Sequence, residues 1–322
     1  MDEAVWVEAP ARLHLGLIDL RGDLGRLFGG LGAALESPSL RLEVRLAPKL
    51  TAPGDESERL VLFASRYLAH HGITQGAELR LERAIPAHAG LGSGTQLALA
   101  TARALATLLG HPTDVTSLAR AVGRARRSAI GTWAFEQGGF LLEGGRRVED
   151  DAPAPLLLRR AMPEGWCCVL AIPGVARGLS GAAEDQAFRD LPPPPADRVE
   201  KIAHRILMGV LPALVEGDLP AFGRGITEVQ RLVGEMFVPV QGGRFAHARV
   251  AQLVDDLLEL GAAGAGQSSW GPAVFGLFPD QATAQGAGDR LAGRGTVFVT
   301  AFNNCGARSG EFLKTPSGPS RG

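Results

Sequence analysis

Cysteine is scarce in this sequence, which has three in 322 residues: Cys167, Cys168 and Cys305. Adjacent cysteines rarely bridge each other, and the spacing of the three is not typical of a zinc site. We therefore expect reduced thiols, and we exclude a disulfide framework and a structural zinc site. A nucleophilic role for Cys305 stays open, although a packed cysteine is the commoner finding.

An excess of charge of one sign is missing as well. The 33 basic and 34 acidic side chains give a formal net charge of -1, whereas nucleic-acid and anionic-membrane binding usually require a strong basic imbalance. No apolar run approaches the roughly 20 residues that span a bilayer, and the first residues, MDEAV, do not resemble a secretory signal. We expect a globular protein of the cytoplasm that binds neither nucleic acid nor membrane.

Hydrophobic patterns in the first half predict an α+β arrangement. Alternation of apolar and polar side chains indicates strands, apolar residues at helical spacing indicate helices, and the glycine-rich residues 19–26 suit a hairpin turn. Gly72 and Gly110 stand where helices commonly end. In order, the predicted elements are strands at 5–17 and 39–46, a helix at 58–71, a strand at 77–83 and a helix at 96–109.

The second half has the same mixed character. Residues 191–195, LPPPP, exclude regular secondary structure there. The predicted elements are a strand at 166–173, helices at 199–216, 219–236 and 245–260, and strands at 273–278 and 296–301. We expect two domains, 1–162 and 163–312, followed by a disordered tail at 313–322, whose Pro, Ser and Gly content is typical of unstructured ends.

The strongest local signal is the glycine-rich loop at residues 86–95, PAHAGLGSGT, between the strand at 77–83 and the helix at 96–109. Glycines let the backbone turn sharply and bring its N–H groups close to an anion, and the helix N-terminus adds a favourable dipole. The loop lacks the lysine of a Walker motif. It predicts a phosphate cradle, with a plain turn capped by Ser93 or Thr95 as the structural alternative.

This loop resembles the second motif of the GHMP family, which is named for its galactose, homoserine, mevalonate and phosphomevalonate kinases. Residues 261–272, GAAGAGQSSWGP, resemble the glycine-rich third motif of the same family and follow in the right order. The resemblance implies a GHMP kinase-like α+β fold, with an N-terminal domain that binds phosphate and a ferredoxin-like C-terminal domain. The substrate cleft is expected between the two domains.

One position argues against a kinase. Many kinases of the family carry Ser-Gly-Ile-Asp after the second motif, with the Asp as presumed base for the acceptor hydroxyl. The matching residues here, 128–131, read SAIG, and Gly131 has no side chain that takes a proton. Loss of a general base typically costs about 10²- to 10⁴-fold in rate, although some kinases of the family work without this Asp.

Several further segments resemble one branch of the family, the β-ribofuranosylaminobenzene 5'-phosphate synthases. The resemblance runs from about residue 8 to residue 307. Its segments are 11–20 (ARLHLGLIDL), 25–26 (GR), 29–32 (GGLG), 135–140 (FEQGGF), 178–181 (GLSG), 238–243 (VPVQGG) and 267–272 (QSSWGP).

That resemblance implies an early step of methanopterin synthesis. Phosphoribosyl pyrophosphate and 4-aminobenzoate, or 4-hydroxybenzoate, would give the ribofuranosylated ring, carbon dioxide and pyrophosphate. The site must hold several phosphate charges and stabilise the departing anion, with Mg²⁺ as the expected metal. The para substituent of the acceptor supplies the electron push, so no organic cofactor is expected.

Three polar residues of the first hairpin are the catalytic candidates. Asp19 would stabilise the developing cation or help position Mg²⁺, and Arg26 would bind a phosphate or carboxylate with its planar fork. The alternative is an exposed turn pair worth at most about 1 kcal/mol. His14 stands in an apolar run, where a hydrogen-bonded core histidine is the alternative to a catalytic one.

The remaining candidates bind substrate or metal. Arg127 belongs to a basic run with Arg124 and Arg126, for which a solvated helix face is the alternative. Glu136 is the candidate Mg²⁺ ligand, with a helix-face carboxylate as the alternative. The substrate- and phosphate-binding candidates are Arg12, Gly90, Leu91, Gly92, Ser93, Gly94, Thr95, Arg127, Gln267, Ser268 and Ser269.

Three functions therefore remain open on the sequence. A decarboxylating phosphoribosyl transfer is the first, an ATP-dependent small-molecule kinase with a different base is the second, and a non-catalytic nucleotide-binding module is the third. A homodimer is possible, because the family suggests one.

Overall fold

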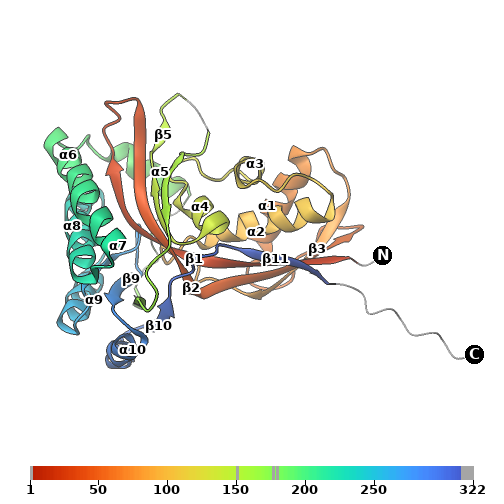
Figure 1. The fold of residues 1–322 in the computed structure, drawn as a ribbon. Coiled ribbons are helices and arrows are strands. Elements are labelled where there is room, and N and C mark those ends of the chain that lie inside the picture. The colour runs from red at the N-terminus through yellow and green to blue at the C-terminus, as the bar shows by residue number, and fades with distance from the viewer. Residues whose placement is uncertain (1–2, 150–151, 176–177, 179–180, 313–322) are drawn as a thin grey trace, which may run out of the picture.

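The computed structural model describes residues 3–149, 152–175, 178 and 181–312. The predicted disordered tail at 313–322 lies outside the described residues, as do Leu179 and Ser180. Figure 1 shows two groups of helices at opposite ends of the molecule, with the longest strands running between them.

A seven-stranded sheet is built around one long antiparallel hairpin. Its strands β1 (Ala4–Asp19) and β2 (Arg26–Ala47) pair along most of their length. The strand order is β11-β1-β2-β4-β6, and β3 and β5 also pair with β2. The other strands are β3 (Gly76–Arg83), β4 (Phe140–Glu143), β5 (Arg146–Arg147), β6 (Leu156–Arg160) and β11 (Arg308–Phe312).

In the described part of the chain, four helices accompany this sheet: α1 (Ser57–His70), α2 (Ser93–Leu108), α3 (Val115–Ala121) and α4 (Ile130–Gln137). Helix α2 lies against β1 and β2, and α1 and α3 pack on α2. The alanine-rich sequence of α2 explains this central place, because small side chains let ten of its residues be buried close to the sheet. The N-terminus of α2 is thereby fixed at the middle of the molecule.

The second sheet has the order β10-β7-β9-β8. Its strands are β7 (Cys167–Ile172), β8 (Gly264–Gln267), β9 (Val274–Phe278) and β10 (Thr296–Ala301). The helices of this half are α5 (Ala182–Asp190), α6 (Ala196–Arg205), η1 (Ile206–Val210), α7 (Leu211–Glu216), α8 (Leu219–Gln241), α9 (Ala248–Glu259) and α10 (Gln281–Arg290). If consecutive helices are counted as one helical unit, the elements of this half follow the order β-α-β-β-α-β. This order and the antiparallel sheet confirm the predicted ferredoxin-like half.

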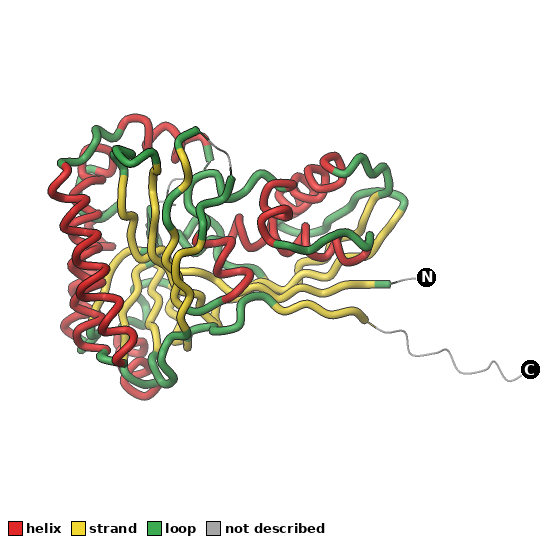
Figure 2. The backbone as a smooth tube through the Cα atoms, turned by 45° about the horizontal axis from the view of Figure 1, so that its top comes forward, coloured by secondary structure: helices red, strands yellow, loops and turns green. Residues whose placement is uncertain are grey.

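The two halves share a core. One continuous cluster of buried apolar side chains runs from Leu13 in β1 and Leu99 in α2 to Phe222 in α8. Strand β11 also returns to the first sheet, where it pairs with Ala4–Glu8 (Figure 2). The domain boundary at residue 162 stays a prediction. Strand β11 belongs to the predicted second domain, but it pairs with β1 of the predicted first domain.

Most predicted elements are present with shifted ends. The strand predicted at 39–46 is wrong at its start, because β2 begins at Arg26 and continues through a segment of glycine and alanine that has no alternation. The helix predicted at 219–236 continues to Gln241 as α8, with Pro239 inside it. Among the described residues, no helix is long and apolar enough to cross a membrane.

Candidate active site

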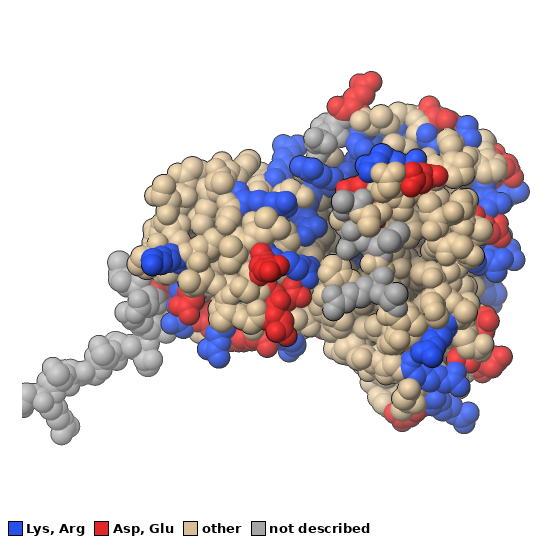
Figure 3. Space-filling view, turned by 180° about the vertical axis from the view of Figure 1, so that it is seen from behind, with Lys and Arg blue, Asp and Glu red and all other residues tan. Residues whose placement is uncertain are grey.

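A cavity of about 830 Å³ lies where the two halves meet. Its walls come from β1, β2, α1, the glycine-rich loop, residues 120–128, α5, α8, residues 244–245 and residues 267–271. In the space-filling view of Figure 3, lysine and arginine side chains gather along the cleft between the two lobes. The cavity therefore combines the two glycine-rich motifs in one site.

The glycine-rich loop is held from both sides. The guanidinium of Arg12 donates to the Gly90 carbonyl oxygen (2.6 Å), and the Ser268 hydroxyl donates to the same oxygen (2.7 Å). Gly90 has φ +82°, and a Cβ there would lie 2.2 Å from the Ser268 carbonyl oxygen. Only glycine fits this position, because both its conformation and the close approach exclude a side chain.

Gly92 is the N-cap of α2, with φ +77° and no side-chain hydrogen bond to the cap. The alternative in which Ser93 or Thr95 caps the helix is therefore wrong. The first turn of α2 opens onto the cavity through Ser93, Gly94 and Thr95. Backbone N–H groups at such a turn bind anions well, because the helix dipole favours negative charge there.

The cavity wall is strongly cationic. Among the residues that the structure describes, eight arginines and two carboxylates line it, a formal excess of six positive charges in a chain whose net charge is -1. The arginines are Arg12, Arg59, Arg66, Arg120, Arg124, Arg126, Arg127 and Arg244.

Arg124 is a part-buried arginine of this wall. Burial, followed by repulsion from Arg59, Arg66 and Arg127, lowers its pKa to about 10. Its Nε atom is buried without a hydrogen-bond partner, and its guanidinium stacks over Phe63 at 4.7 Å. Guanidinium groups that repel one another in a partly buried site are stabilised by a bound anion, so this wall suits a polyanionic ligand.

Arg59 and Arg124 also converge on the helix N-terminus. A Cβ placed on Gly94 would lie 3.0 Å from an Nη of Arg59 and 3.1 Å from an Nη of Arg124. The backbone donors of α2 and the two guanidinium groups therefore face the same space. This is an arrangement in which phosphate oxygens find charge and hydrogen bonds together.

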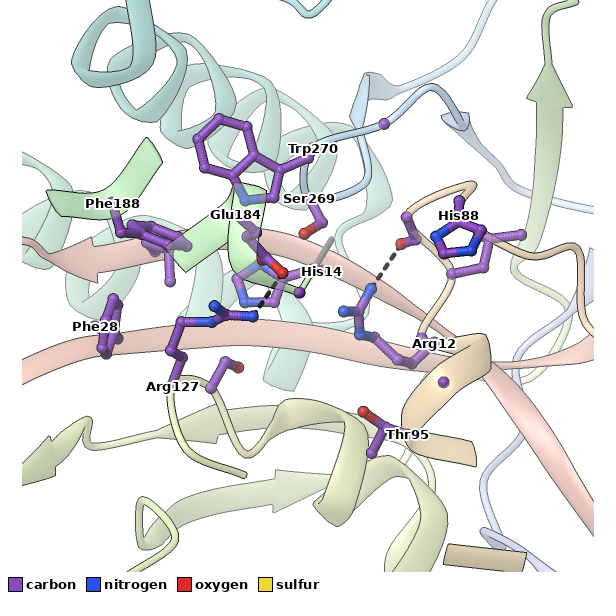
Figure 4. Close-up of a pocket in the computed structure, with 18 of the residues that line it drawn as sticks. Arg12, His14, Phe28, His88, Thr95, Arg127, Glu184, Phe188, Ser269 and Trp270 are labelled. Atoms are coloured by element: carbon purple, nitrogen blue, oxygen red, sulfur yellow. Dashed lines mark hydrogen bonds and ion pairs between the residues drawn. The ribbon is translucent and has the colours of Figure 1, made fainter. Parts of the chain in front are cut away.

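Arg12 and His14 point into the cavity from β1 (Figure 4). Burial lowers the pKa of Arg12 to about 10, so this guanidinium stays charged at neutral pH. Burial, with the charge of Arg12 as a second cause, lowers the pKa of His14 to about 3. At neutral pH His14 is therefore an uncharged imidazole, which offers a hydrogen bond rather than a positive charge.

The side of the cavity away from the loop is aromatic. The rings of Phe188 and Trp270 are 5.3 Å apart at 76°, and those of Phe237 and Trp270 are 4.7 Å apart at 79°. Phe28 adds a further edge-to-face contact with Phe188, at 5.3 Å. Such a wall suits a flat ring, since aromatic groups prefer edge-to-face and offset contacts.

The carboxylate of Glu184 lies between the cationic part and the aromatic part of the cavity. Glu184, in the first turn of α5, pairs with Arg127 at 2.6 Å. Burial raises the pKa of Glu184, and the charges of Arg127 and Arg12 oppose that rise. Figure 4 shows Glu184 near the centre of the view, between Trp270 on one side and Arg12 on the other.

The structure brings most of the predicted site residues to this cavity. Those on its wall are Arg12, His14, Gly90, Leu91, Gly92, Ser93, Gly94, Thr95, Arg127, Gln267 and Ser269. Ser268 is fully buried behind the loop, where it also accepts a hydrogen bond from the His14 backbone N–H at 3.0 Å. Ser268 therefore positions the loop rather than lining the cavity.

Asp19, Arg26 and Glu136 are not among the described residues that line the cavity. The Asp19 carboxylate accepts hydrogen bonds from the backbone N–H groups of Arg21 and Gly22 in the hairpin turn. Arg26 donates to the Gly145 carbonyl oxygen at 2.8 Å. Glu136 pairs with Arg103 at 2.6 Å. The catalytic and metal roles of these three residues stay predictions, and each side chain has a structural partner.

Several cavity residues were missed by sequence reasoning. Arg59, Arg66 and Glu184 belong to helices, where a charged residue is usually solvated, and no motif marks them. Phe188 and Trp270 come from segments far apart in the chain, so only the fold brings them together. The run at Arg124, Arg126 and Arg127 was the one signal, and all three residues line the cavity.

The position of the missing kinase base lies close to the loop. A Cβ on Gly131 would lie 3.1 Å from the Thr95 Cγ2 atom. A carboxylate side chain at residue 131 would therefore require Thr95 to move. The glycine is adapted to the packing of this site, which agrees with the prediction that no base acts from residue 131.

The described residues contain no group of three or more His, Cys, Asp or Glu side chains arranged to hold a metal ion. The carboxylates on the cavity wall are Glu184 and Asp185, and both pair with Arg127. A metal in this cavity would therefore depend on oxygens of the substrate, as Mg²⁺ often does in phosphate sites.

Comparison with known proteins agrees with this architecture. The model of the GHMP kinases N terminal domain matches residues 59–135, and that of the GHMP kinases C terminal region matches residues 210–296. The crystal structure of Leishmania major mevalonate kinase in complex with R-mevalonate superposes with a TM-score of 0.73 over 93% of this chain and 96% of that chain. At 15% identity this similarity shows the fold alone.

Two similar curated relatives are β-ribofuranosylphenol 5'-phosphate synthases from archaea. The protein from Methanothermobacter thermautotrophicus is 36% identical over 94% of this chain and 97% of its own length. The one from Archaeoglobus fulgidus is 34% identical over 84% of this chain and 87% of its own length. The chain therefore belongs to the GHMP kinase superfamily and, within it, to the family of β-ribofuranosylphenol 5'-phosphate synthases.

Proposed function

We propose that this protein transfers the ribosyl phosphate group of phosphoribosyl pyrophosphate to a ring carbon of a para-substituted benzoate, with release of carbon dioxide and pyrophosphate. The observation that carries the proposal is the division of one cavity into a cationic part and an aromatic part. A donor with two phosphorylated ends matches the first part, and a benzoate ring matches the second. An early place in methanopterin synthesis belongs to the same proposal.

The relatives are named for a ribofuranosylphenol product. A phenol at the para position arises when the acceptor is 4-hydroxybenzoate, whereas 4-aminobenzoate gives an aniline. We therefore place 4-hydroxybenzoate first as the acceptor of this enzyme and 4-aminobenzoate second. Both groups donate electrons to the ring, so the chemistry of the carbon–carbon bond is the same.

The chain's own residues would divide the work as follows. The first turn of α2, with Arg59 and Arg124, binds phosphate oxygens of the donor and stabilises the pyrophosphate as it departs. Arg12 fixes the loop and adds a charge that stays present at neutral pH. Neutral His14 is placed to hydrogen-bond the sugar. Holding donor and acceptor in contact supplies much of the acceleration, because both partners are positioned before the reaction.

Mg²⁺ fits this cavity as an ion that enters with the donor. When bound, it would neutralise pyrophosphate charge, and the hydroxyl groups of Ser93 and Thr95 are the protein oxygens available at the loop. The predicted cytoplasmic location and homodimer belong to this proposal and rest on the family resemblance.

The test uses carboxyl-labelled 4-hydroxybenzoate and 4-aminobenzoate in parallel, each with phosphoribosyl pyrophosphate, Mg²⁺ and purified protein. We expect labelled carbon dioxide and pyrophosphate in a 1:1 ratio, dependent on the donor, and faster with 4-hydroxybenzoate. Absence of both products with either acceptor would refute the proposal. ATP consumption with a sugar or polyol acceptor would instead support the kinase alternative.

A further inference from the structure

We propose that the carboxylate of Glu184 stabilises the positive charge that develops on the anomeric carbon of the donor as pyrophosphate leaves. The sequence assigned this role to Asp19. The inference rests on the proposed function and adds a catalytic residue to it.

The place of Glu184 is the first argument. Its side chain lines the cavity and is 19% exposed, and it lies between the cationic part and the aromatic part. The anomeric carbon must occupy this boundary, because it is bonded to the pyrophosphate on one side and is attacked by the ring on the other. Asp19, by contrast, lies in the hairpin turn, where the backbone N–H groups of Arg21 and Gly22 bind its carboxylate.

The charge balance of the cavity is the second argument. A carboxylate inside a wall of arginines opposes the binding of a polyanionic donor. It becomes favourable when the sugar carries positive charge, so its interaction is stronger in the transition state than in the ground state. Only interactions with that difference accelerate the chemical step.

The contacts of Glu184 are the third argument. One carboxylate oxygen pairs with Arg127, and Coulombic interaction links the carboxylate to Arg12. These cations oppose the rise in the pKa of Glu184 that burial causes, and so favour the ionised carboxylate. Asp185, the neighbouring residue, also pairs with Arg127, but its side chain is 51% exposed at the rim. Among the described residues of the wall, Glu184 is thus the less exposed of the two acids.

In the proposed step the side chain of Glu184 forms no bond and exchanges no proton. The bond between the anomeric carbon and the pyrophosphate oxygen breaks, and its electron pair leaves with pyrophosphate. A pair from the ring forms the new carbon–carbon bond at the carbon that bears the carboxylate. The bond to that carboxylate then breaks, its pair restores the aromatic ring, and carbon dioxide departs.

The experiment compares Glu184→Gln, Glu184→Asp and Asp19→Asn with wild type. For Glu184→Gln we expect kcat to fall about a hundredfold, equivalent to about 2.7 kcal/mol, while the Kd for phosphoribosyl pyrophosphate stays equal or decreases. Glu184→Asp, which keeps the charge, should turn over at least tenfold faster than the glutamine variant. The acid limb of the wild-type kcat profile should be absent from Glu184→Gln, a change that a structural role would not produce.

Asp190→Asn is the matched control, because it removes an exposed carboxylate of the same helix that does not line the cavity, and it should leave kcat within about threefold. Wild-type turnover in Glu184→Gln, with the loss found in Asp19→Asn instead, would overturn the inference. So would a Glu184→Gln variant with unchanged kcat and weaker donor binding, or with a raised Mg²⁺ requirement. An inactive wild type would refute the proposed function itself, so the two failures are distinguishable.

Discussion

Replacing Glu143 by glutamine should change how the stability of this protein depends on pH. Glu143 ends β4 with a fully buried side chain. One carboxylate oxygen accepts a hydrogen bond from the Ala129 N–H at 2.5 Å, and the other is buried without a partner. Burial raises the pKa of Glu143 to about 7, against a partial lowering by Ser128, Ala129 and Arg12.

The sign follows from proton binding in the two states. The folded pKa lies above the unfolded value, so the folded state holds a proton between about pH 4.5 and pH 7 that the unfolded state has lost. Over this window the free energy of unfolding falls as the pH rises. A shift from 4.5 to about 7 corresponds to about 3 kcal/mol. The stabilisation is fully present below pH 4.5 and lost above pH 7.

The glutamine variant keeps an acceptor for the Ala129 N–H and cannot ionise. We expect the free energy of unfolding of Glu143→Gln minus that of wild type to rise by about 3 kcal/mol between pH 4.5 and pH 7 and to be constant above. Urea unfolding at half-unit steps from pH 4 to pH 8.5 measures it. Glu200→Gln, on the exposed surface of α6, is the control for removal of one carboxylate. A difference that does not change with pH would refute the reasoning.

Three further substitutions test the loop and its surroundings. Arg124→Ala should weaken pyrophosphate binding at least tenfold in calorimetry at low salt, because a charge-assisted contact is lost, and an unchanged Kd would contradict the anion site. Ser268→Ala should lower the free energy of unfolding by about 2 kcal/mol, because it unpairs the His14 N–H and removes a donor to Gly90; an unchanged Tm would refute this. Gly131→Ala should weaken pyrophosphate binding by displacing Thr95 while leaving Tm equal or higher, and unchanged binding would show that Thr95 yields without effect.

The fold was predictable where local patterns are strong. The helix at 58–71 and the strands at 77–83 and 296–301 agree with α1, β3 and β10 to within one residue. The first part of β2 was not, because its glycine and alanine residues carry no alternation and become strand only by pairing with β1 and β4. Strand β8 lies in the third motif, where the sequence reads as a loop.

The site residues, too, include some that the sequence predicted and others that it did not. The glycine-rich loop could be predicted from the sequence, because its backbone conformation requires glycine: Gly90 and Gly92 both adopt positive φ. The arginines of α1 and the residues of α5 could not be assigned, because their role comes from the side of the helix that faces the cavity. Asp19 was predicted from the cluster of polar residues in the first hairpin and from the family resemblance, yet its partners are the backbone N–H groups of its own turn.

The pairing of β11 with β1 has a consequence for synthesis of the chain. Glu8 pairs with Arg308, about 300 residues later. At translation rates of roughly 5–20 residues per second, β1 waits roughly 15–60 s before its outer neighbour exists. During that interval one edge of the longest hairpin presents unpaired backbone groups, and such edges pair with other chains. The newborn chain is therefore most prone to aggregate before β11 emerges, and this vulnerable interval covers the synthesis of every cavity-lining segment that follows β1 and β2.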